Sequence, residues 1–247
     1  MEARADAFLG GRLVIRQPVR GYRAATDPVL LAAAAPVADG DRVLDLGCGA
    51  GVAALCVGAR VPGVVLAGLE VQAGYAGLAR ENAAANGVAL DVHEGDLRAM
   101  PAALKAQSFD CVLMNPPWYP PDHSASPDPG RAAAHREDGA SVADWVGAAL
   151  ARLRQRGWLV AIHRTERLPE LLTALRGRAG AVTVLPLVAR AGREAARVIL
   201  RARKDVKTPF RLCPPLVLHQ GMAHAHDGDD FTPGARRVLR DGAALEF

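Results

Sequence analysis

The sequence has few cysteines and no long apolar run, and both absences narrow the class of protein. Its four cysteines show no Cys-x-x-Cys spacing, so we interpret them as reduced core residues, neither disulfides nor zinc ligands. No apolar segment follows Met1, and no stretch approaches eighteen uninterrupted apolar residues. Neither a signal peptide nor a membrane span is therefore indicated, and we expect a cytoplasmic protein without bound metal.

Lysine and the aromatic residues are scarce as well. Lysine occurs only at positions 105, 204 and 207, so nearly all of the basic charge comes from arginine. The net charge of +4 permits an anionic partner such as nucleic acid but does not demonstrate one. With 247 residues, half of them apolar, the chain can bury a full core, and we expect one domain over residues 1–247.

Three glycines at alternate positions follow a short apolar run. The run Arg42–Leu46 predicts a buried strand, and the residues from Val52 onward have helical character. Between them lie Gly47, Gly49 and Gly51. Without a Cβ, such a loop lets a ligand lie against the N–H groups of a helix N-terminus. An ordinary strand-to-helix turn also uses glycine, so the loop alone leaves a binding site and a plain turn open.

Polar residues follow three further predicted strands, at the edge where open α/β sheets bind ligands. The strands cover residues 64–69, 90–93 and 109–114, and the polar residues are Glu70, Asp96 and Asn115. Glu70 has the spacing from the glycine loop at which a nucleotide-binding fold places a carboxylate for two ribose hydroxyls. A solvated surface glutamate is the alternative.

Two of these stretches resemble the motifs of a known family. Asp45-Leu46-Gly47-Cys48-Gly49-Ala50-Gly51 resembles the first motif of the class I S-adenosylmethionine-dependent methyltransferases. Asn115-Pro116-Pro117-Trp118 resembles the Asn-Pro-Pro-aromatic motif of those members that methylate amino or amide nitrogens. The resemblance implies S-adenosylmethionine as cofactor. It also implies a Rossmann-like, doubly wound α/β fold with a seven-stranded, mostly parallel sheet whose last strand is antiparallel.

The resemblance further implies which residues hold the cofactor. Asp45 would lie near its amino group, and Asp96 and the N–H of Leu97 would bind its adenine. Thr26 and Asp27 would close over its methionine end, within an N-terminal extension over residues 1–40. The expected cofactor-binding set is Thr26, Asp27, Asp45, Gly47, Gly49, Gly51, Glu70, Asp96, Leu97 and Asn115.

Several of these residues have a structural alternative. Thr26 or Asp27 could cap a helix over residues 28–35, and Asp96 could cap a helix over residues 97–104. Asp45 could form an Asx turn that tightens the glycine loop. The sequence leaves both kinds of role open at each position.

The expected catalytic residues are Asn115, Pro116, Pro117 and Trp118. The exocyclic amine of a purine is a poor nucleophile because its lone pair is delocalised into the ring. The side-chain oxygen of Asn115 and the carbonyl of Pro116 could each accept one N–H, which orients the lone pair and stabilises the developing positive charge. Pro117 would stiffen the loop, and Trp118 would offer a face for stacking of a flat substrate. A proline-rich turn is the alternative, but it does not explain Asn and Trp together.

The rest of the chain predicts the remaining architecture. We expect a strand pair over residues 8–17, a strand over 157–163 and a final antiparallel pair over 182–188 and 197–201. We expect helices over 72–86, 142–153 and 168–177, followed by a strand, hairpin and helix elaboration over 205–247.

Three polar segments remain. A long loop over residues 120–140 is typical of a functional or mobile lid. The arginine-rich stretch 190–211 predicts either phosphate contacts or a solvated sheet edge. The histidines and aspartates of 219–230 favour a polar hairpin loop over a metal site.

Within this family the sequence most resembles the bacterial enzymes that methylate adenine in tRNA, and this resemblance implies a methyltransferase that acts on the exocyclic amine of adenine in tRNA. A release-factor glutamine methyltransferase is the first alternative, but its helical docking domain would not fit in the 44 residues before Asp45. A guanine-modifying ribosomal RNA enzyme and a non-catalytic, cofactor-binding RNA scaffold are the others. The sequence does not indicate an oligomeric state.

Overall fold

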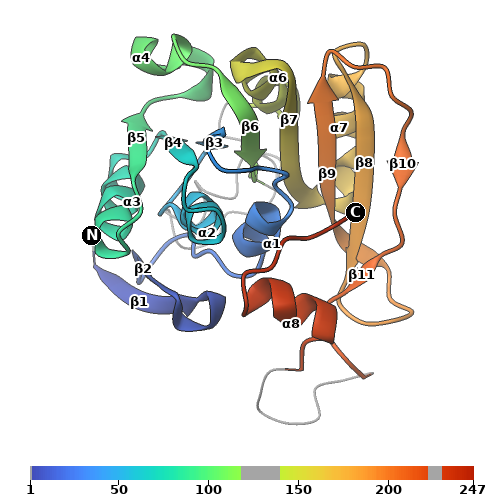
Figure 1. Cartoon of the computed structure of the whole chain (residues 1–247), viewed down its shortest axis with the longest axis horizontal. Coiled ribbons are helices and arrows are strands. Elements are labelled where there is room, and N and C mark those ends of the chain that lie inside the picture. The colour runs from blue at the N-terminus through green and yellow to red at the C-terminus, as the bar shows by residue number, and fades with distance from the viewer. Residues whose placement is uncertain (1, 118–139, 222–229) are drawn as a thin grey trace.

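The computed structural model describes residues 2–117, 140–221 and 230–247 (Figure 1). Within these ranges, no helix is long and apolar enough to cross a membrane. The helices are α1 (Asp27–Ala33), α2 (Val52–Arg60), α3 (Ala73–Ala85), α4 (Ala102–Lys105), α6 (Val142–Arg152), α7 (Leu168–Leu175) and α8 (Pro233–Leu239). The strands are β1 (Ala3–Phe8), β2 (Leu13–Pro18), β3 (Arg42–Leu46), β4 (Val65–Glu70), β5 (Leu90–Glu94), β6 (Phe109–Met114), β7 (Leu153–Arg164), β8 (Ala179–Val188), β9 (Ala195–Lys204), β10 (Arg211–Leu212) and β11 (Leu216–Val217).

A mixed sheet forms the centre of the fold, and in Figure 1 it runs from β5 on the left to β10 on the right. Its strand order is β10-β8-β9-β7-β6-β3-β4-β5, and β11 adds to β8. The strands from β5 to β7 pair in parallel, whereas β9 runs antiparallel to β7 and β8. The predicted doubly wound α/β sheet is thus confirmed. The two-residue strands β10 and β11 are additions to the seven predicted strands.

Apolar residues alternate along the central strands and divide the core between the two faces of the sheet. Val43 and Leu113 pack in the cluster that contains α1 and α2, whereas Leu44 and Val112 pack with α6 and α7. All six residues of β6 are buried, as expected for a central strand that is covered on both faces. Helices on both faces leave the carboxyl ends of β3, β4 and β6 at one edge of the sheet.

The N-terminal strand pair docks on α3. β1 and β2 form a separate antiparallel sheet, joined by a 3₁₀ turn over Leu9–Gly11. The side chain of Asn82 exchanges hydrogen bonds of 2.8 and 2.9 Å with the backbone of Arg16, and the side chain of Asn86 exchanges two of 2.9 Å with the backbone of Val14. These contacts hold the chain after β2 beside the carboxyl ends of the sheet strands.

Two predicted elements need correction. The predicted helix over 97–104 is instead a 3₁₀ turn over Leu97–Ala99 followed by the short α4, because Pro101 between them has no N–H and disfavours helix before it. β7 begins at Leu153, four residues before the predicted strand, and includes a register shift against β6 and a left-handed Arg156 (φ 62°). Such an irregularity hides the strand from a simple pattern of alternation.

Arginine side chains tie the C-terminal segment to α1. Arg201 on β9 donates hydrogen bonds to the carbonyls of Ala34, Leu245 and Phe247 at 2.7, 2.6 and 3.1 Å. Its guanidinium also lies 3.7 Å from the ring centroid of Phe247. Burial lowers the pKa of Arg201 to about 10, which leaves the side chain charged at neutral pH. One cation therefore satisfies carbonyls at the end of α1 and in the C-terminal segment.

We expect Arg201→Met to lower the free energy of unfolding by about 2–4 kcal/mol, because it leaves partly buried carbonyls without a donor. Urea unfolding followed by circular dichroism measures this change. Arg193→Met is the matched control, since Arg193 is exposed and its replacement should change the free energy by less than about 0.5 kcal/mol. Equal effects of the two substitutions would contradict the role given to Arg201.

Candidate functional site

A cavity of about 270 Å³ lies at the carboxyl ends of β3, β4, β5 and β6. Of the residues that the sequence predicts for a site, those in its lining are Asp45, Gly47, Gly49, Glu70, Asp96, Leu97, Asn115, Pro116 and Pro117. The structure thus brings together, at one sheet edge, residues from four separate strand ends. Gly51, Thr26 and Asp27 do not line the cavity, and Trp118 lies outside the described residues.

The glycine loop follows β3 in left-handed backbone conformations. Gly47, Gly49 and Gly51 have φ values of 75°, 55° and 87°, a region that other residues adopt only at a cost. A Cβ on Gly47 would also collide with the ring of Trp145 from α6. At Gly51 a Cβ would make only ordinary contacts of 3.4 Å with Ala79 and Leu90, so the left-handed backbone is what favours glycine there.

Asp45 is buried beneath this loop, with 3% of its surface exposed. Its Oδ2 accepts a hydrogen bond of 3.2 Å from the N–H of Ala54 in the first turn of α2. The carboxylate therefore binds the helix N-terminus, in place of the Asx turn considered as an alternative. Burial is the main cause that raises the pKa of Asp45 to about 7.

Glu70 holds the glycine loop from the end of β4. Its Oε2 accepts a hydrogen bond of 2.9 Å from the N–H of Gly49, and its Oε1 accepts one of 2.8 Å from the N–H of Gln72. Only 7% of the residue is exposed, which rules out the solvated surface glutamate. Burial raises the pKa of Glu70. Each carboxylate oxygen can accept a second hydrogen bond, so a ligand in the cavity could still bind it.

Asp96 caps the 3₁₀ turn that follows it, as its structural alternative predicts. The carboxylate accepts a 2.8 Å hydrogen bond from the N–H of Arg98 and pairs with the Arg98 guanidinium at 2.5 Å. These hydrogen bonds lower the pKa of Asp96. Asp96, Leu97 and Arg98 all line the cavity, so capping does not prevent contact with a ligand.

The capping alternative for Thr26 and Asp27 needs correction. Thr26 precedes α1 without a side-chain capping bond, so the alternative that capping explains these residues is wrong. Asp27 is buried and forms an ion pair with Arg197 on β9. The same helix provides Pro28 and Leu31 to the cavity wall. The ion pair thus fixes the start of a helix that borders the cavity.

Asn115 follows β6 directly and lines the cavity. Its Nδ2 lies 3.5 Å from the hydroxyl oxygen of Tyr22. Its Oδ1 is buried and has no hydrogen-bond partner among the residues that the structure describes. An orphaned buried amide oxygen is costly unless a ligand provides the missing donor. Pro116 and Pro117, which come next, also line the cavity.

The motifs of the sequence do not include several residues that line the cavity. Tyr22 and Gln17 come from the N-terminal segment, Tyr75 from α3 and Trp145 from α6. None of them follows a strand of the central sheet, and none has a motif spacing. Only Tyr22 and Gln17 carried a signal, because they lie in the N-terminal extension over residues 1–40 that was expected to close over the cofactor.

Most of the basic side chains of residues 190–211 have partners within the protein. Arg197 pairs with Asp27, Arg201 binds carbonyls, and the Arg203 guanidinium lies 4.9 Å from the centroid of the Trp158 ring. Lys204 donates a 2.8 Å hydrogen bond to the carbonyl of Leu153. Neither a phosphate patch nor a solvated edge, the two predicted alternatives, describes the majority of this stretch.

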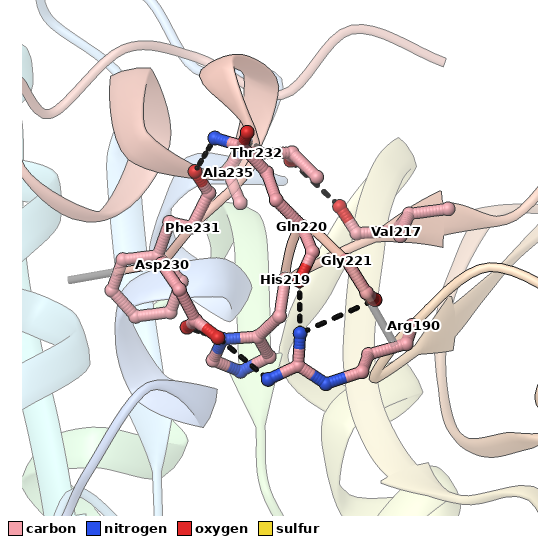
Figure 2. Close-up of polar contacts among 9 residues, drawn as sticks. All are labelled: Arg190, Val217, His219, Gln220, Gly221, Asp230, Phe231, Thr232 and Ala235. Carbon is pink, nitrogen blue, oxygen red and sulfur yellow. Dashed lines mark hydrogen bonds and ion pairs between the residues drawn. The ribbon is translucent and has the colours of Figure 1, made fainter. Parts of the chain in front are cut away.

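Arg190 belongs to a cluster at the base of the 219–230 segment (Figure 2). Asp230 pairs with Arg190 at 2.6 Å and lies 2.5 Å from Nδ1 of His219. An isolated antiparallel bridge joins His219 to Phe231, which agrees with a hairpin. Within the described ranges, no group of three or more His, Cys, Asp or Glu residues could hold a metal ion. The other histidines of this segment and the loop 120–139 lie outside the described residues.

The burial of Asp45 should make stability depend on pH. Between about pH 4 and pH 7 the folded protein keeps a proton on Asp45 that the unfolded chain loses, so stability falls as pH rises. We expect Asp45→Asn, which retains an acceptor for Ala54, to raise the thermal midpoint of the ligand-free protein by about 5 °C at pH 8. At pH 5 the two proteins should differ little. A midpoint difference that is equal at both pH values in calorimetry would contradict this.

Comparisons with known proteins agree with the geometry of this site. Residues 25–128 match the family model of the methyltransferase small domain. A tRNA1(Val) (adenine(37)-N6)-methyltransferase of Aeromonas hydrophila is 34% identical over 181 residues, which cover 71% of this chain and 74% of the relative. The crystal structure of an Agrobacterium tumefaciens protein, described as a predicted O-methyltransferase, matches this chain with a TM-score of 0.71 and 26% sequence identity. The match covers 88% of this chain and 97% of that one.

Another solved structure that resembles this chain is described as an enzyme that methylates ribosomal RNA, in contrast to the tRNA methyltransferase above. The Thermus thermophilus 16S rRNA N2 G1207 methyltransferase, solved with AdoMet and guanosine, has a TM-score of 0.56 at 21% identity, over 82% of this chain and 50% of that one. At this identity the likeness concerns the fold alone.

Proposed function

We propose that this chain, which belongs to the family of the tRNA1(Val) (adenine(37)-N6)-methyltransferases, transfers a methyl group from S-adenosylmethionine to the exocyclic amine of an adenine in tRNA. One observation carries the proposal. Asn115 presents a buried amide oxygen without a partner among the described residues, in the cavity that the glycine loop also lines. An amine N–H of the substrate is the donor that this oxygen lacks.

The carboxylates that line the cavity suit the polar groups of the cofactor. Asp45 would pair with its ammonium group, Glu70 would accept from the ribose hydroxyls, and Asp96 with Leu97 would bind the adenine. The missing Cβ at Gly49 leaves open space beside the backbone, because no atom of the described residues lies within 4 Å of the place where that Cβ would be. When bound, the cofactor supplies an electrophilic methyl group on a positively charged sulfur.

Asn115 and Pro116 would prepare the nucleophile. The Asn115 Oδ1 and the Pro116 carbonyl each accept one N–H of the amine, which turns its lone pair away from the ring and toward the methyl group. Both oxygens also stabilise the positive charge that develops on nitrogen during transfer. Pro117 restricts the loop, and Trp118 remains the predicted stacking residue. The released proton can pass to water.

Oxygen as the methyl acceptor is the second candidate, because the solved relative from Agrobacterium is described as a predicted O-methyltransferase. A hydroxyl nucleophile needs a base that removes its proton. Asn115 offers an amide, which accepts a hydrogen bond but not a proton. The residues after β6 therefore favour an amine.

The proposal assigns roles to both ends of the chain. Residues 1–40 would close over the cofactor, since Tyr22, Ala24 and Pro28 line the cavity. Residues 205–247 would support α1 through Arg201, whose guanidinium binds both the carbonyl of Ala34 after α1 and the carbonyl of Leu245. One methyltransferase domain over residues 1–247 remains the prediction for the whole chain, with tRNA as partner.

The direct test is transfer of a labelled methyl group to unmodified tRNA, with ribosomal RNA and release factors as separate substrates. We expect label in tRNA, recovered as N6-methyladenosine after nucleoside analysis. Asn115→Ala should lower the transfer rate about a hundredfold or more while S-adenosylhomocysteine binds within about threefold of wild type. Label only in release factor or only in ribosomal RNA would replace tRNA as substrate, and cofactor binding without any transfer would favour a scaffold.

Cofactor affinity should depend on the ionisation of Asp45. Because burial raises its pKa to about 7, and because only the carboxylate pairs with an ammonium group, affinity should increase with pH. We expect an increase of about tenfold between pH 6 and pH 8 in calorimetric titrations with S-adenosylhomocysteine. Asp45→Asn should bind weakly with no such increase. Wild-type affinity that stays flat over this range would exclude Asp45 as the partner of the ammonium group.

A further inference from the structure

Tyr22 is the described side chain that contacts the amide of Asn115. It comes from the segment between β2 and α1, far from Asn115 in the sequence, and it lines the same cavity. Its hydroxyl oxygen lies 3.5 Å from Asn115 Nδ2, the upper limit for a hydrogen bond. The amide nitrogen is thus directed at Tyr22, and Oδ1 is the end left without a partner among the described residues.

An asparagine side chain can rotate its amide and exchange its donor and acceptor ends. The proposed reaction needs one of the two orientations, because only the oxygen can accept an amine N–H. A rotated amide would present two N–H groups to the amine and would repel it. A contact that holds Nδ2 in place consequently decides whether Asn115 can act.

The position of Tyr22 is itself fixed by its surroundings. The hydroxyl of Tyr75 on α3 donates a 3.0 Å hydrogen bond to the backbone carbonyl of Tyr22. On the same helix, Asn82 donates 2.9 Å bonds to the carbonyls of Ala50 in the glycine loop and Arg16 in β2. Burial, and then the charge of Asp27, raise the pKa of Tyr22, so its hydroxyl stays protonated.

We propose that Tyr22 is a positioning residue whose hydroxyl holds the Asn115 amide with Oδ1 turned toward the amine that is methylated. This inference rests on the proposed function for its meaning, but the contact itself can be tested without a substrate. If Tyr22 instead served only as a wall of the cavity, Tyr22→Phe would keep the ring and change nothing at Asn115.

The chain has only three asparagines, Asn82, Asn86 and Asn115, which makes a sharp test possible. Protein labelled with ¹⁵N-asparagine should show three pairs of side-chain amide signals, and Asn115→Ala identifies the pair of Asn115. In Tyr22→Phe we expect the Asn115 amide protons to shift and to exchange with solvent about fivefold faster or more. Asn82 and Asn86 bond through both ends of their amides, so their signals are internal controls.

The rate of methyl transfer provides a second test of the role of Tyr22. We expect Tyr22→Phe to lower the single-turnover rate of methyl transfer to tRNA about tenfold, with cofactor affinity within about twofold of wild type. In the Asn115→Ala background the same substitution should cause no further loss, because Tyr22 acts through Asn115. A purely structural role would instead lower cofactor affinity and thermal midpoint alike in both backgrounds.

The outcomes separate this inference from the proposed function. Unchanged Asn115 signals and exchange in Tyr22→Phe would overturn it, as would equal rate losses in the two backgrounds. Wild-type protein that methylates no tRNA would contradict the proposed function, whereas the amide signals would still decide whether Tyr22 holds Asn115.

Discussion

The site depends on the hydrogen bonds that the carboxylate of Glu70 accepts from backbone N–H groups. This carboxylate links three segments, since it belongs to the end of β4 and accepts N–H bonds from Gly49 in the glycine loop and Gln72 at the start of α3. The carbonyl of neighbouring Leu69 binds the same loop through the N–H groups of Gly47 and Cys48. A left-handed loop that would otherwise expose unpaired N–H groups is therefore held in one shape before any ligand arrives.

The sequence predicted what depends on neighbours along the chain. The strands before Glu70 and Asn115 and the helix after the glycine loop follow from local hydrophobic period and turn chemistry. Parallel strands then place their ends at one edge, so Asp45, Glu70, Asp96 and Asn115 meet without further information. The α/β class of the fold was predictable for the same reason.

What the sequence could not reveal are contacts between distant segments. The pairing of Asp27 with Arg197, the packing of Trp145 against Gly47 and the approach of Tyr22 to Asn115 each join elements far apart in the sequence. No periodicity encodes such a pairing. The ion pair of Asp27 could not be predicted, because a buried ion pair and a ligand contact both require a carboxylate at the start of a helix.

Several of the many arginines have a structural role that the net charge does not indicate. Arg12, Arg60 and Arg201 each donate to backbone carbonyls at helix ends or chain turns, which a guanidinium with five donors does better than a single ammonium group. Arginines that donate to carbonyls inside the protein contribute less to binding of an anionic partner than the net charge suggests.

The contacts of Leu245 with α1 have a consequence for biosynthesis. Its N–H binds the carbonyl of Ala33 at the end of α1, and its carbonyl binds Arg201. Ribosomes synthesise α1 early and Leu245 late, so α1 lacks this support while most of the chain is being made. The cavity wall that α1 forms should therefore mature after the sheet, and nascent chains should be unable to hold a ligand tightly there.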